Sequence, residues 1–188
     1  MRDKISDLLT ITIFTKETDY CLPFAYFQLE QLCFAEKYAI TPRNKSDFDN
    51  MFKHKTLIIS VQKSSSLIGM AFIDYISSDL CYLRVICVHP LYRRQGICKI
   101  LVSKIQETFL SNSITFIAFV SETDLIVRIF ERAGFTHCSF VPKELAQKLF
   151  AYNKKLEQYQ PRTSIPNYYS LKNGNNVDAS YYLLRYKK

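Results

Sequence analysis

The chain has 188 residues, 48% of them hydrophobic and 22% charged, which is typical of a globular domain long enough to bury a sizeable core. Lys and Arg number 25 against 17 Asp and Glu, so the formal net charge is +8; it either serves solubility or favours an anionic partner such as a phosphorylated small molecule. We expect no membrane span, because no apolar run reaches the roughly 20 residues required. We also expect no signal peptide at the start.

The first third of the chain predicts a strand followed by two helices. Residues 8–15 alternate between apolar and polar positions, as a strand does. Residues 23–40 begin with a proline and carry a broad apolar face, which predicts a helix that ends at Pro42. Residues 46–53 predict a short second helix with Ser46 as its N-cap.

Three strands at short spacing follow, and this spacing is typical of an antiparallel meander. We expect them at 56–61, 67–75 and 83–88. Helical spacing then runs from 97 to 108, and the apolar run 114–120 predicts a strand covered on both faces.

The last third predicts one amphipathic helix and a longer tail. Residues 124–133 have helical spacing, and Gly134 stands where a left-handed C-cap belongs, with Phe135 beyond it. The tail predicts a polar helix near 142–158, a turn at Asn173-Gly174 and a last strand at 179–186. This order predicts an α/β (α+β) fold with a mixed sheet and helices on both faces.

The six cysteines show neither a CxxC pair nor the Cys/His spacing of a metal site. We therefore expect no metal and reduced thiols in a cytoplasmic protein. They are Cys21, Cys33, Cys81, Cys87, Cys98 and Cys138.

The stretch between the third meander strand and the next helix predicts an anion site. A helix start offers unpaired N–H groups and partial positive charge, and Gly96 has no Cβ to keep a phosphate away from the backbone. Arg93, Arg94 and Lys99 add positive charge, so the stretch suits a di- or polyphosphate. It matches neither a Walker loop nor a Rossmann glycine fingerprint.

The same stretch resembles the acetyl-CoA-binding motif of the GNAT superfamily of N-acetyltransferases, whose core is Arg/Gln-x-x-Gly-x-Gly/Ala. Arg93 and Gly96 match this motif, and Cys98 takes the place of its last small residue. A second match is Phe130-Glu131-Arg132-Ala133-Gly134-Phe135, which resembles the end of the family's helix after the fifth strand.

The resemblance implies a single GNAT-like domain over 1–188, with an acetyl-CoA-binding core at 8–140 and an atypical extension at 141–188. It implies about seven mostly antiparallel strands, with the fourth and fifth splayed to admit the pantetheine arm. The activity implied is transfer of an acetyl group from acetyl-CoA to a primary amine by direct attack in a ternary complex. The cofactor-binding residues implied are Ile86, Cys87, Val88, Arg93, Arg94, Gln95, Gly96, Ile97, Cys98, Lys99, Thr123 and Phe130.

Phe130 occupies the position at which the family usually carries a tyrosine acid, and phenylalanine cannot donate a proton. Three alternatives stay open. The CoA thiolate leaves without an acid, Tyr181 or Tyr182 stands in, or the chain binds acyl-CoA without turning it over.

Glu122 is the candidate general base, because it lies just past the fifth predicted strand; its alternative role is charge compensation at a helix start. Asp74 is a second candidate base, and Thr123 stands where many relatives carry Asn. His89 is either structural or an acid–base group. Cys87 or Cys98 would act as a nucleophile only beside a base, and none is visible in the sequence.

Two other function classes compete with an enzyme. An inactive acyl-CoA-binding module would explain Phe130. A nucleic-acid-binding domain would explain the charge, but the chain lacks a zinc pattern and an RNA-stacking signature, so we expect no nucleic acid.

Overall fold

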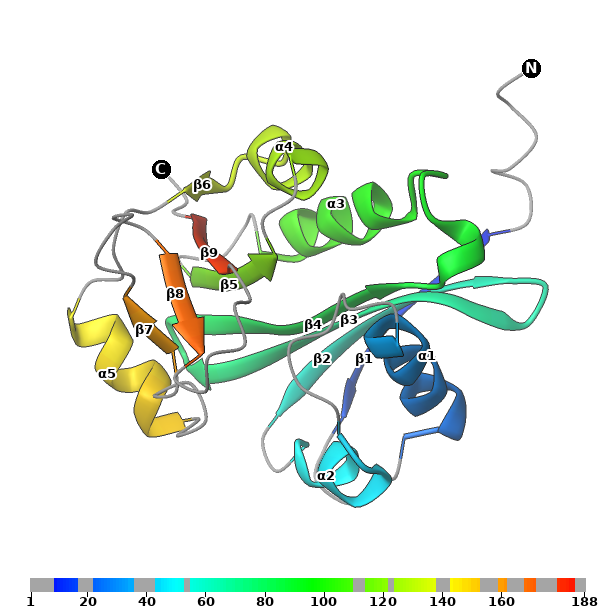
Figure 1. Cartoon of the computed structure of the whole chain (residues 1–188), viewed down its shortest axis with the longest axis horizontal. Helices are drawn as coiled ribbons and strands as arrows, with labels where there is room; N and C mark the ends of the chain where they lie inside the picture. Colours follow the sequence, from blue (N-terminus) through cyan, green and yellow to red (C-terminus); the bar gives the residue numbers. More distant parts are fainter. Residues whose placement is uncertain are drawn as a thin grey trace. The chain divides into compact units, whose positions relative to one another are not determined.

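The computed structural model describes residues 9–16, 22–35, 43–52, 55–109, 114–121, 124–137, 143–152, 159–161, 168–171 and 179–184. The chain divides into two compact units, and we describe each by itself (Figure 1). The first unit comprises Met1–Tyr75 and Arg84–Thr108, and the second comprises Ile76–Leu83 and Phe109–Lys188. The single domain expected over 1–188 stays a prediction.

The first unit contains β1 (Leu9–Lys16), which corresponds to the predicted first strand. It also contains the three strands of the predicted meander, β2 (Thr56–Lys63), β3 (Ser66–Ser77) and β4 (Leu80–Val88), the last two continuing into the second unit. β1 pairs antiparallel with β2, and β2 pairs antiparallel with β3. The β2–β3 turn is tight because Ser64 and Ser65 both take left-handed backbone angles, with φ of 47° and 69°.

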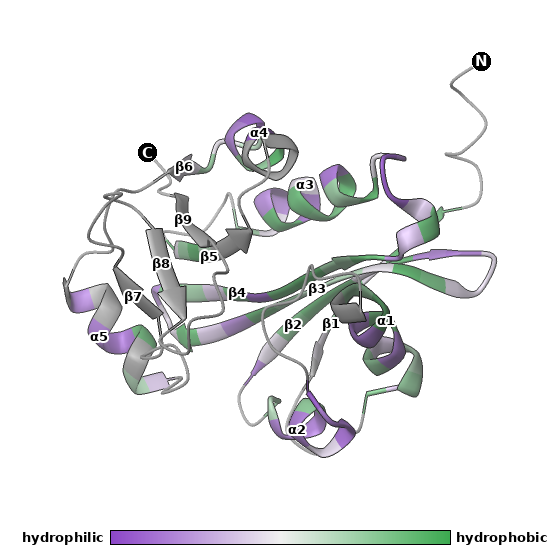
Figure 2. Ribbon diagram, in the orientation of Figure 1, coloured by the Kyte–Doolittle hydropathy of each residue, from purple (hydrophilic) through white to green (hydrophobic). Residues whose placement is uncertain are grey.

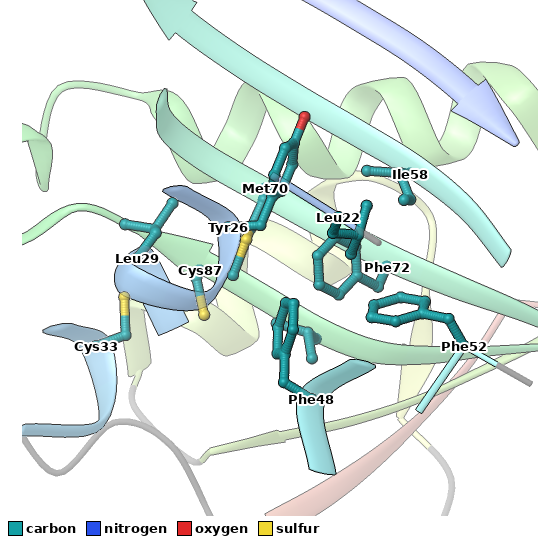
Figure 3. Packing of buried hydrophobic residues seen from close by; sticks show 11 residues of the cluster. Leu22, Tyr26, Leu29, Cys33, Phe48, Phe52, Ile58, Met70, Phe72 and Cys87 are labelled. Carbon is teal, nitrogen blue, oxygen red and sulfur yellow. The ribbon is translucent and has the colours of Figure 1, made fainter. Parts of the chain in front are cut away.

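Three helices cover the two faces of these strands: α1 (Phe24–Ala35), α2 (Lys45–Asn50) and α3 (Ile97–Phe109). α1 and α2 pack on one face in a cluster with Met70 and Phe72 of β3 (Figure 3). α3 is amphipathic (Figure 2) and lies on the other face, against Gly69. Helices on both faces, expected from the sequence, are thus confirmed for this unit. They also explain why β3 is buried without interruption from Ile68 to Asp74, since successive side chains point to opposite faces and both faces are covered.

Ser46 is not the N-cap of α2, contrary to the sequence-based expectation. The helix begins one residue earlier, and Asn44 has the extended backbone of a cap. Its side-chain oxygen accepts the Asp47 N–H at 2.7 Å.

Gly69 marks the place where α3 approaches β3 most closely. A Cβ at this position would lie 2.7 Å from Cγ2 of Ile97 and 3.4 Å from Cδ1 of Leu101. Since Ile97 is β-branched and stiff, this methyl group could not move aside easily. The glycine therefore sets how close the start of α3 comes to the sheet.

The second unit is built around β5 (Thr115–Ser121), which runs parallel to the first half of β4. On its other side β5 pairs antiparallel with β9 (Ala179–Leu184). β9 also pairs with β6 (Thr136–His137) and with β8 (Tyr168–Leu171), and β8 pairs with β7 (Tyr159–Pro161). The helices are α4 (Asp124–Arg132) and α5 (Lys143–Tyr152). One parallel pair among antiparallel ones confirms a mixed, mostly antiparallel arrangement.

The expected count of about seven strands is not confirmed, since the described residues form nine. The extra strands are two to four residues long, too short to show an alternating pattern. β7 and β8 lie between the predicted helix near 142–158 and the predicted last strand at 179–186, where no strand was expected. The turn expected at Asn173-Gly174 falls outside the described residues.

The pairing of β4 with β5 covers four residues of each strand. It runs from Leu80 opposite Thr115 to Leu83 opposite Ala118. β4 then continues to Val88 and β5 to Ser121. Short pairing is what a splayed pair requires, although the splay itself stays a prediction.

The end of α4 confirms the cap expected from the sequence. Gly134 has a φ of 84°, and its N–H donates to the Glu131 carbonyl at 2.9 Å. The Phe135 N–H donates to the Phe130 carbonyl at 3.0 Å, and the two phenylalanine rings meet edge to face with centroids 4.9 Å apart. Both hydrogen bonds and the apolar contact define a Schellman motif.

No helix within the described residues is both long and apolar enough to cross a membrane.

Candidate functional site

The turn that joins β4 to α3 begins with a short 3-10 helix, Pro90–Tyr92. His89 caps this helix, since its Nδ1 accepts the Leu91 N–H at 3.3 Å. The backbone N–H of His89 donates to the Ile68 carbonyl at 2.9 Å, which fixes the turn to β3. These contacts favour the structural role for His89 over an acid–base role.

Two left-handed residues then direct the chain into α3. Arg94 has a φ of 61° and Gly96 a φ of 83°. A left-handed conformation is strained for arginine and unstrained for glycine, so the backbone geometry itself requires the glycine. Alternating backbone conformations of this kind turn successive N–H groups toward one concave side, which suits an anion.

The start of α3 supplies the remaining donors. Its first backbone bond runs from the Ile100 N–H to the Gly96 carbonyl, at 3.0 Å. The amides of residues 97–99 precede this bond and belong to the first turn, which leaves N–H groups without intrahelical partners. A Cβ built on Gly96 meets no described atom within 4 Å, so the approach to these amides is open.

The two arginines of the turn differ in what their side chains do. Nε of Arg93 donates to the Val88 carbonyl at 3.3 Å, and this side chain is half-buried. Arg94, Gln95 and Lys99 are exposed. Arg93 therefore holds the turn against β4, whereas Arg94 and Lys99 present charge to the solvent.

The end of β4 alternates in its exposure. Cys87 points into the cluster under α1, and Ile86 and Val88 are half-buried. The Val88 carbonyl accepts Nε of Arg93 and, at 3.4 Å, the thiol of Cys33. A carbonyl oxygen has two lone pairs, so these two contacts use both acceptor positions of Val88.

Neither thiol that the sequence suggested as a nucleophile has the required ionisation. Burial raises the pKa of the Cys98 thiol to about 11. A hydrogen bond to Cys33, followed by burial, raises the pKa of Cys87 well above its ordinary value. Both groups stay protonated near neutral pH, so neither favours covalent catalysis.

Cys33 is the thiol with a lowered pKa, and the sequence analysis did not propose it for a chemical role. Its pKa is lowered to about 7, first by the hydrogen bond from Cys87 and then by contact with the Arg93 guanidinium, against the opposing effect of burial. The two cysteines come from α1 and β4, so no local sequence pattern could have paired them.

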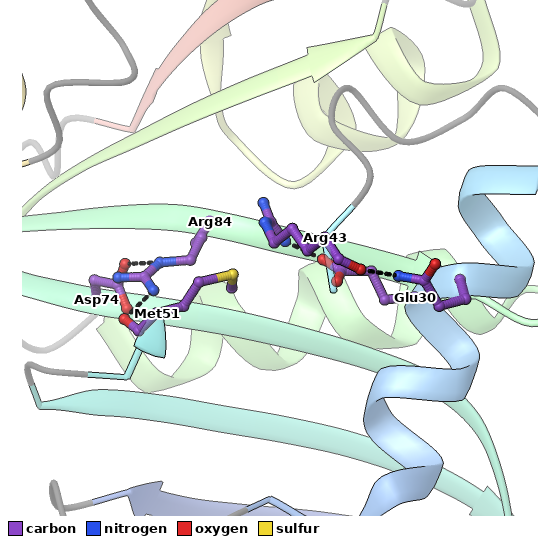
Figure 4. Close-up of polar contacts among 6 residues, drawn as sticks. Glu30, Arg43, Met51, Asp74 and Arg84 are labelled. Atoms are coloured by element: carbon purple, nitrogen blue, oxygen red, sulfur yellow. Dashed lines mark hydrogen bonds and ion pairs between the residues drawn. The ribbon is translucent and has the colours of Figure 1, made fainter. Parts of the chain in front are cut away.

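The two buried carboxylates among the described residues of the first unit each form an ion pair with an arginine (Figure 4). Asp74 is fully buried, forms an ion pair with Arg84 and accepts the Thr56 hydroxyl at 2.8 Å. Arg84 also donates to the Met51 carbonyl, which ties the end of α2 to the meander. Such a pair is unsuited to the role of second candidate base that the sequence suggested for Asp74.

Glu30 on α1 is a second buried carboxylate that the sequence analysis missed. It forms an ion pair with Arg43, and its Oε2 has no hydrogen-bond partner among the described residues. Burial raises the pKa of the Glu30 carboxyl, and the charges of Arg43 and Arg84 only partly oppose this rise. Its position on a helix gave no signal, because acidic residues on helices are usually solvated.

The ring of Phe130 is a core element of the second unit. It is 0% exposed and packs on Phe135, whose ring meets Phe116 with centroids 5.4 Å apart. Glu122 and Thr123 lie outside the described residues. The backbones of Tyr181 and Tyr182 belong to β9, opposite Phe119 and Ala118 of β5.

The model of the Acetyltransferase (GNAT) family matches residues 24–135, which is more than half of the chain. The chain therefore belongs to the GNAT acetyltransferase family. No curated protein matches it.

Solved structures of other acetyltransferases share the fold at low sequence identity. The ribosomal-protein-S18-alanine N-acetyltransferase from Escherichia coli is 17% identical with a TM-score of 0.62, over 95% of this chain and 96% of that one. The putative acetyltransferase yncA from Salmonella typhimurium, solved with its cofactor acetyl-CoA, is 12% identical with a TM-score of 0.63, over 95% of each chain. The PaiA N-acetyltransferase from Thermoplasma acidophilum, in complex with coenzyme A, is 15% identical with a TM-score of 0.54, over 70% of this chain and 93% of that one.

Proposed function

We propose that the chain transfers the acetyl group of acetyl-CoA to a primary amine of a protein, peptide or small molecule, in the cytoplasm. The observation that carries this proposal is the turn from β4 to α3. It combines two left-handed residues, an open helix start and exposed Arg94 and Lys99. These features fit the pyrophosphate of CoA.

Different residues of the turn make different contacts with CoA. The amides of residues 94–99 hold the pyrophosphate, and Arg94 and Lys99 neutralise its charge. Arg93 keeps the turn in place through the Val88 carbonyl. The pantetheine arm pairs with the backbone of residues 86–88.

Acetyl transfer then proceeds in a ternary complex. The amine lone pair attacks the thioester carbonyl, the C–S bond breaks, and the CoA thiolate leaves. A thiolate is a good leaving group, so the reaction does not require a proton donor at the position of the buried Phe130. Glu122 remains the proposed acceptor of the amine proton, and Thr123 remains a proposed cofactor contact.

Calorimetry with CoA tests the assignment of the turn. Arg94→Gln and Lys99→Gln should each weaken CoA binding by roughly 5- to 10-fold, the loss of about one charge-assisted contact. Lys104→Gln is the matched control, because Lys104 lies on the same helix and pairs with Glu107 at 2.6 Å. Equal affinities for all four proteins would remove the phosphate-binding role of the turn.

A panel of amines with an assay for released CoA tests the reaction itself. Acetylation of any primary amine, confirmed by product mass, supports the proposal. CoA binding without turnover of any amine would instead identify an inactive acyl-CoA-binding module.

A further inference from the structure

Two cysteines that lie far apart in the sequence meet between α1 and β4. Cys33 and Cys87 belong to the same buried cluster and are 3% and 8% exposed (Figure 3). The Cys33 thiol donates to the carbonyl of Val88, the residue next to Cys87, at 3.4 Å, and each of the two thiols shifts the pKa of the other. Close approach of two sulfurs is the first requirement for a bond between them.

The surroundings make the two sulfurs chemically unequal. Cys33 contacts the Arg93 guanidinium, whose positive charge stabilises a thiolate. Cys87 stays protonated, because burial and the neighbouring Cys33 raise its pKa. One sulfur therefore reacts first and the other stands ready to resolve the product, which is the arrangement of redox-sensitive pairs.

We propose that Cys33 and Cys87 form a redox-sensitive dithiol, which hydrogen peroxide closes to a disulfide that ties α1 to β4. Peroxide is a small oxidant, so limited local opening at the two side chains is enough to admit it. Cys98, by contrast, is kept protonated by burial.

The reaction balances in two steps. The Cys33 thiolate attacks one peroxide oxygen, the O–O bond breaks, and the released hydroxide takes up a proton to leave as water. Cys33 is then a sulfenic acid. The Cys87 sulfur loses its proton and attacks the Cys33 sulfur, the S–O bond breaks, and the second oxygen leaves as water. The net change oxidises two thiols to one disulfide and reduces one peroxide to two waters.

The disulfide has a direct consequence for the turn described above. Disulfide formation removes the Cys33 thiol, which donates to the Val88 carbonyl. It also removes the thiolate form of Cys33, which the Arg93 guanidinium stabilises. Because Arg93 holds the turn, oxidation should loosen the first residues of α3 and lower the affinity for CoA. This second part rests on the proposed function, whereas formation of the disulfide does not.

Peptide mass mapping after peroxide treatment tests the dithiol. The full-length protein should lose about 2 Da, the mass of two hydrogens, and yield a Cys33–Cys87 linked peptide that dithiothreitol separates. Cys98→Ser is the matched control and should leave the linked peptide unchanged. In Cys87→Ser, Cys33 should instead stop at sulfenic acid, which a dimedone probe detects.

The outcomes separate the two parts of the inference. Absence of the linked peptide in the wild-type protein, or a link from Cys33 to any other cysteine, overturns the proposed dithiol. This measurement uses the wild-type protein, so it does not depend on whether a variant folds. A linked peptide with unchanged CoA affinity overturns the effect on the turn. If the reduced protein does not bind CoA, the proposed function fails while the mapping still decides the dithiol.

Discussion

At the level of single residues, the environment of each side chain decides its chemistry more than its type does. Cys33, Cys87 and Cys98 are all largely buried thiols, yet the pKa is lowered to about 7 for Cys33 and raised for the other two. Burial raises a thiol pKa, and only Cys33 has both a donating thiol and a guanidinium to overcome it. The same contrast separates Asp74, held by Arg84, from Glu30, whose Oε2 lacks a described partner.

The ionisation of Cys33 gives a prediction at this scale. Carbon NMR of the Cys33 β-carbon should titrate with a midpoint near pH 7. Arg93→Gln and Cys87→Ala should each move the midpoint to higher pH, because each removes a group that stabilises the thiolate over the thiol. A midpoint at the ordinary value for a free thiol in the wild-type protein would contradict the role of both neighbours. Lys104→Gln is the control and should leave the midpoint unchanged, because Lys104 pairs with Glu107 on α3.

At the level of elements, the start of α3 is positioned by a missing side chain on β3. Alternate residues of β3 face opposite helices, so Met70 and Phe72 lie under α1 and α2 while Gly69 lies under α3. The close approach at Gly69 fixes how near the sheet Ile97 lies. Ile97 is the first residue of the helix and directly follows the left-handed Gly96. Packing against the sheet and the geometry of the turn therefore determine the same helix start.

Replacement of Gly69 tests this packing. Gly69→Ala should lower the free energy of unfolding by about 1–3 kcal/mol in urea titrations, because the new Cβ would collide with Cγ2 of Ile97. Ile97→Ala removes that methyl group, so the double variant should lose less than the sum of the two single losses, by about 0.5 kcal/mol or more. Strict additivity would mean that the two side chains do not limit each other. Ile97→Ala alone is the necessary reference.

At the level of the whole molecule, a net charge of +8 favours polyphosphate ligands over neutral ones. The charge by itself does not distinguish CoA from nucleic acid. The distinction comes from the turn between β4 and α3, which offers backbone donors at one short segment and only a few exposed cations around it. Such a site suits one pyrophosphate group, whereas a nucleic-acid surface uses many phosphate contacts.

Thermal unfolding tests the choice of ligand. Acetyl-CoA at about 100 times its Kd should add roughly 2.7 kcal/mol to the free energy of unfolding. For a chain of this size that corresponds to a rise in Tm of roughly 5–11 °C. The rise should shrink as salt screens the pyrophosphate. A random oligonucleotide should produce no comparable rise at physiological salt; the reverse result would favour the nucleic-acid reading.

The sequence by itself determined the features that depend on neighbouring residues. Period-two and helical spacing placed β2, β3, β4, α3 and α4 within a few residues, and Gly134 with Phe135 marked the end of α4. The prediction of an anion-binding turn was also local, since it needs only a strand end, a glycine and a helix start. The sequence analysis did not predict the short strands β7 and β8, because three or four residues are too few to show an alternating pattern.

Only the tertiary structure decided which distant side chains meet. The pairing of Cys33 with Cys87, of Asp74 with Arg84 and of Gly69 with Ile97 each joins two different elements. These contacts identify a candidate base as a member of a structural ion pair and show that Cys33 has a lowered pKa. Burial and charge act through space over a few ångströms, so no spacing along the chain could have revealed them.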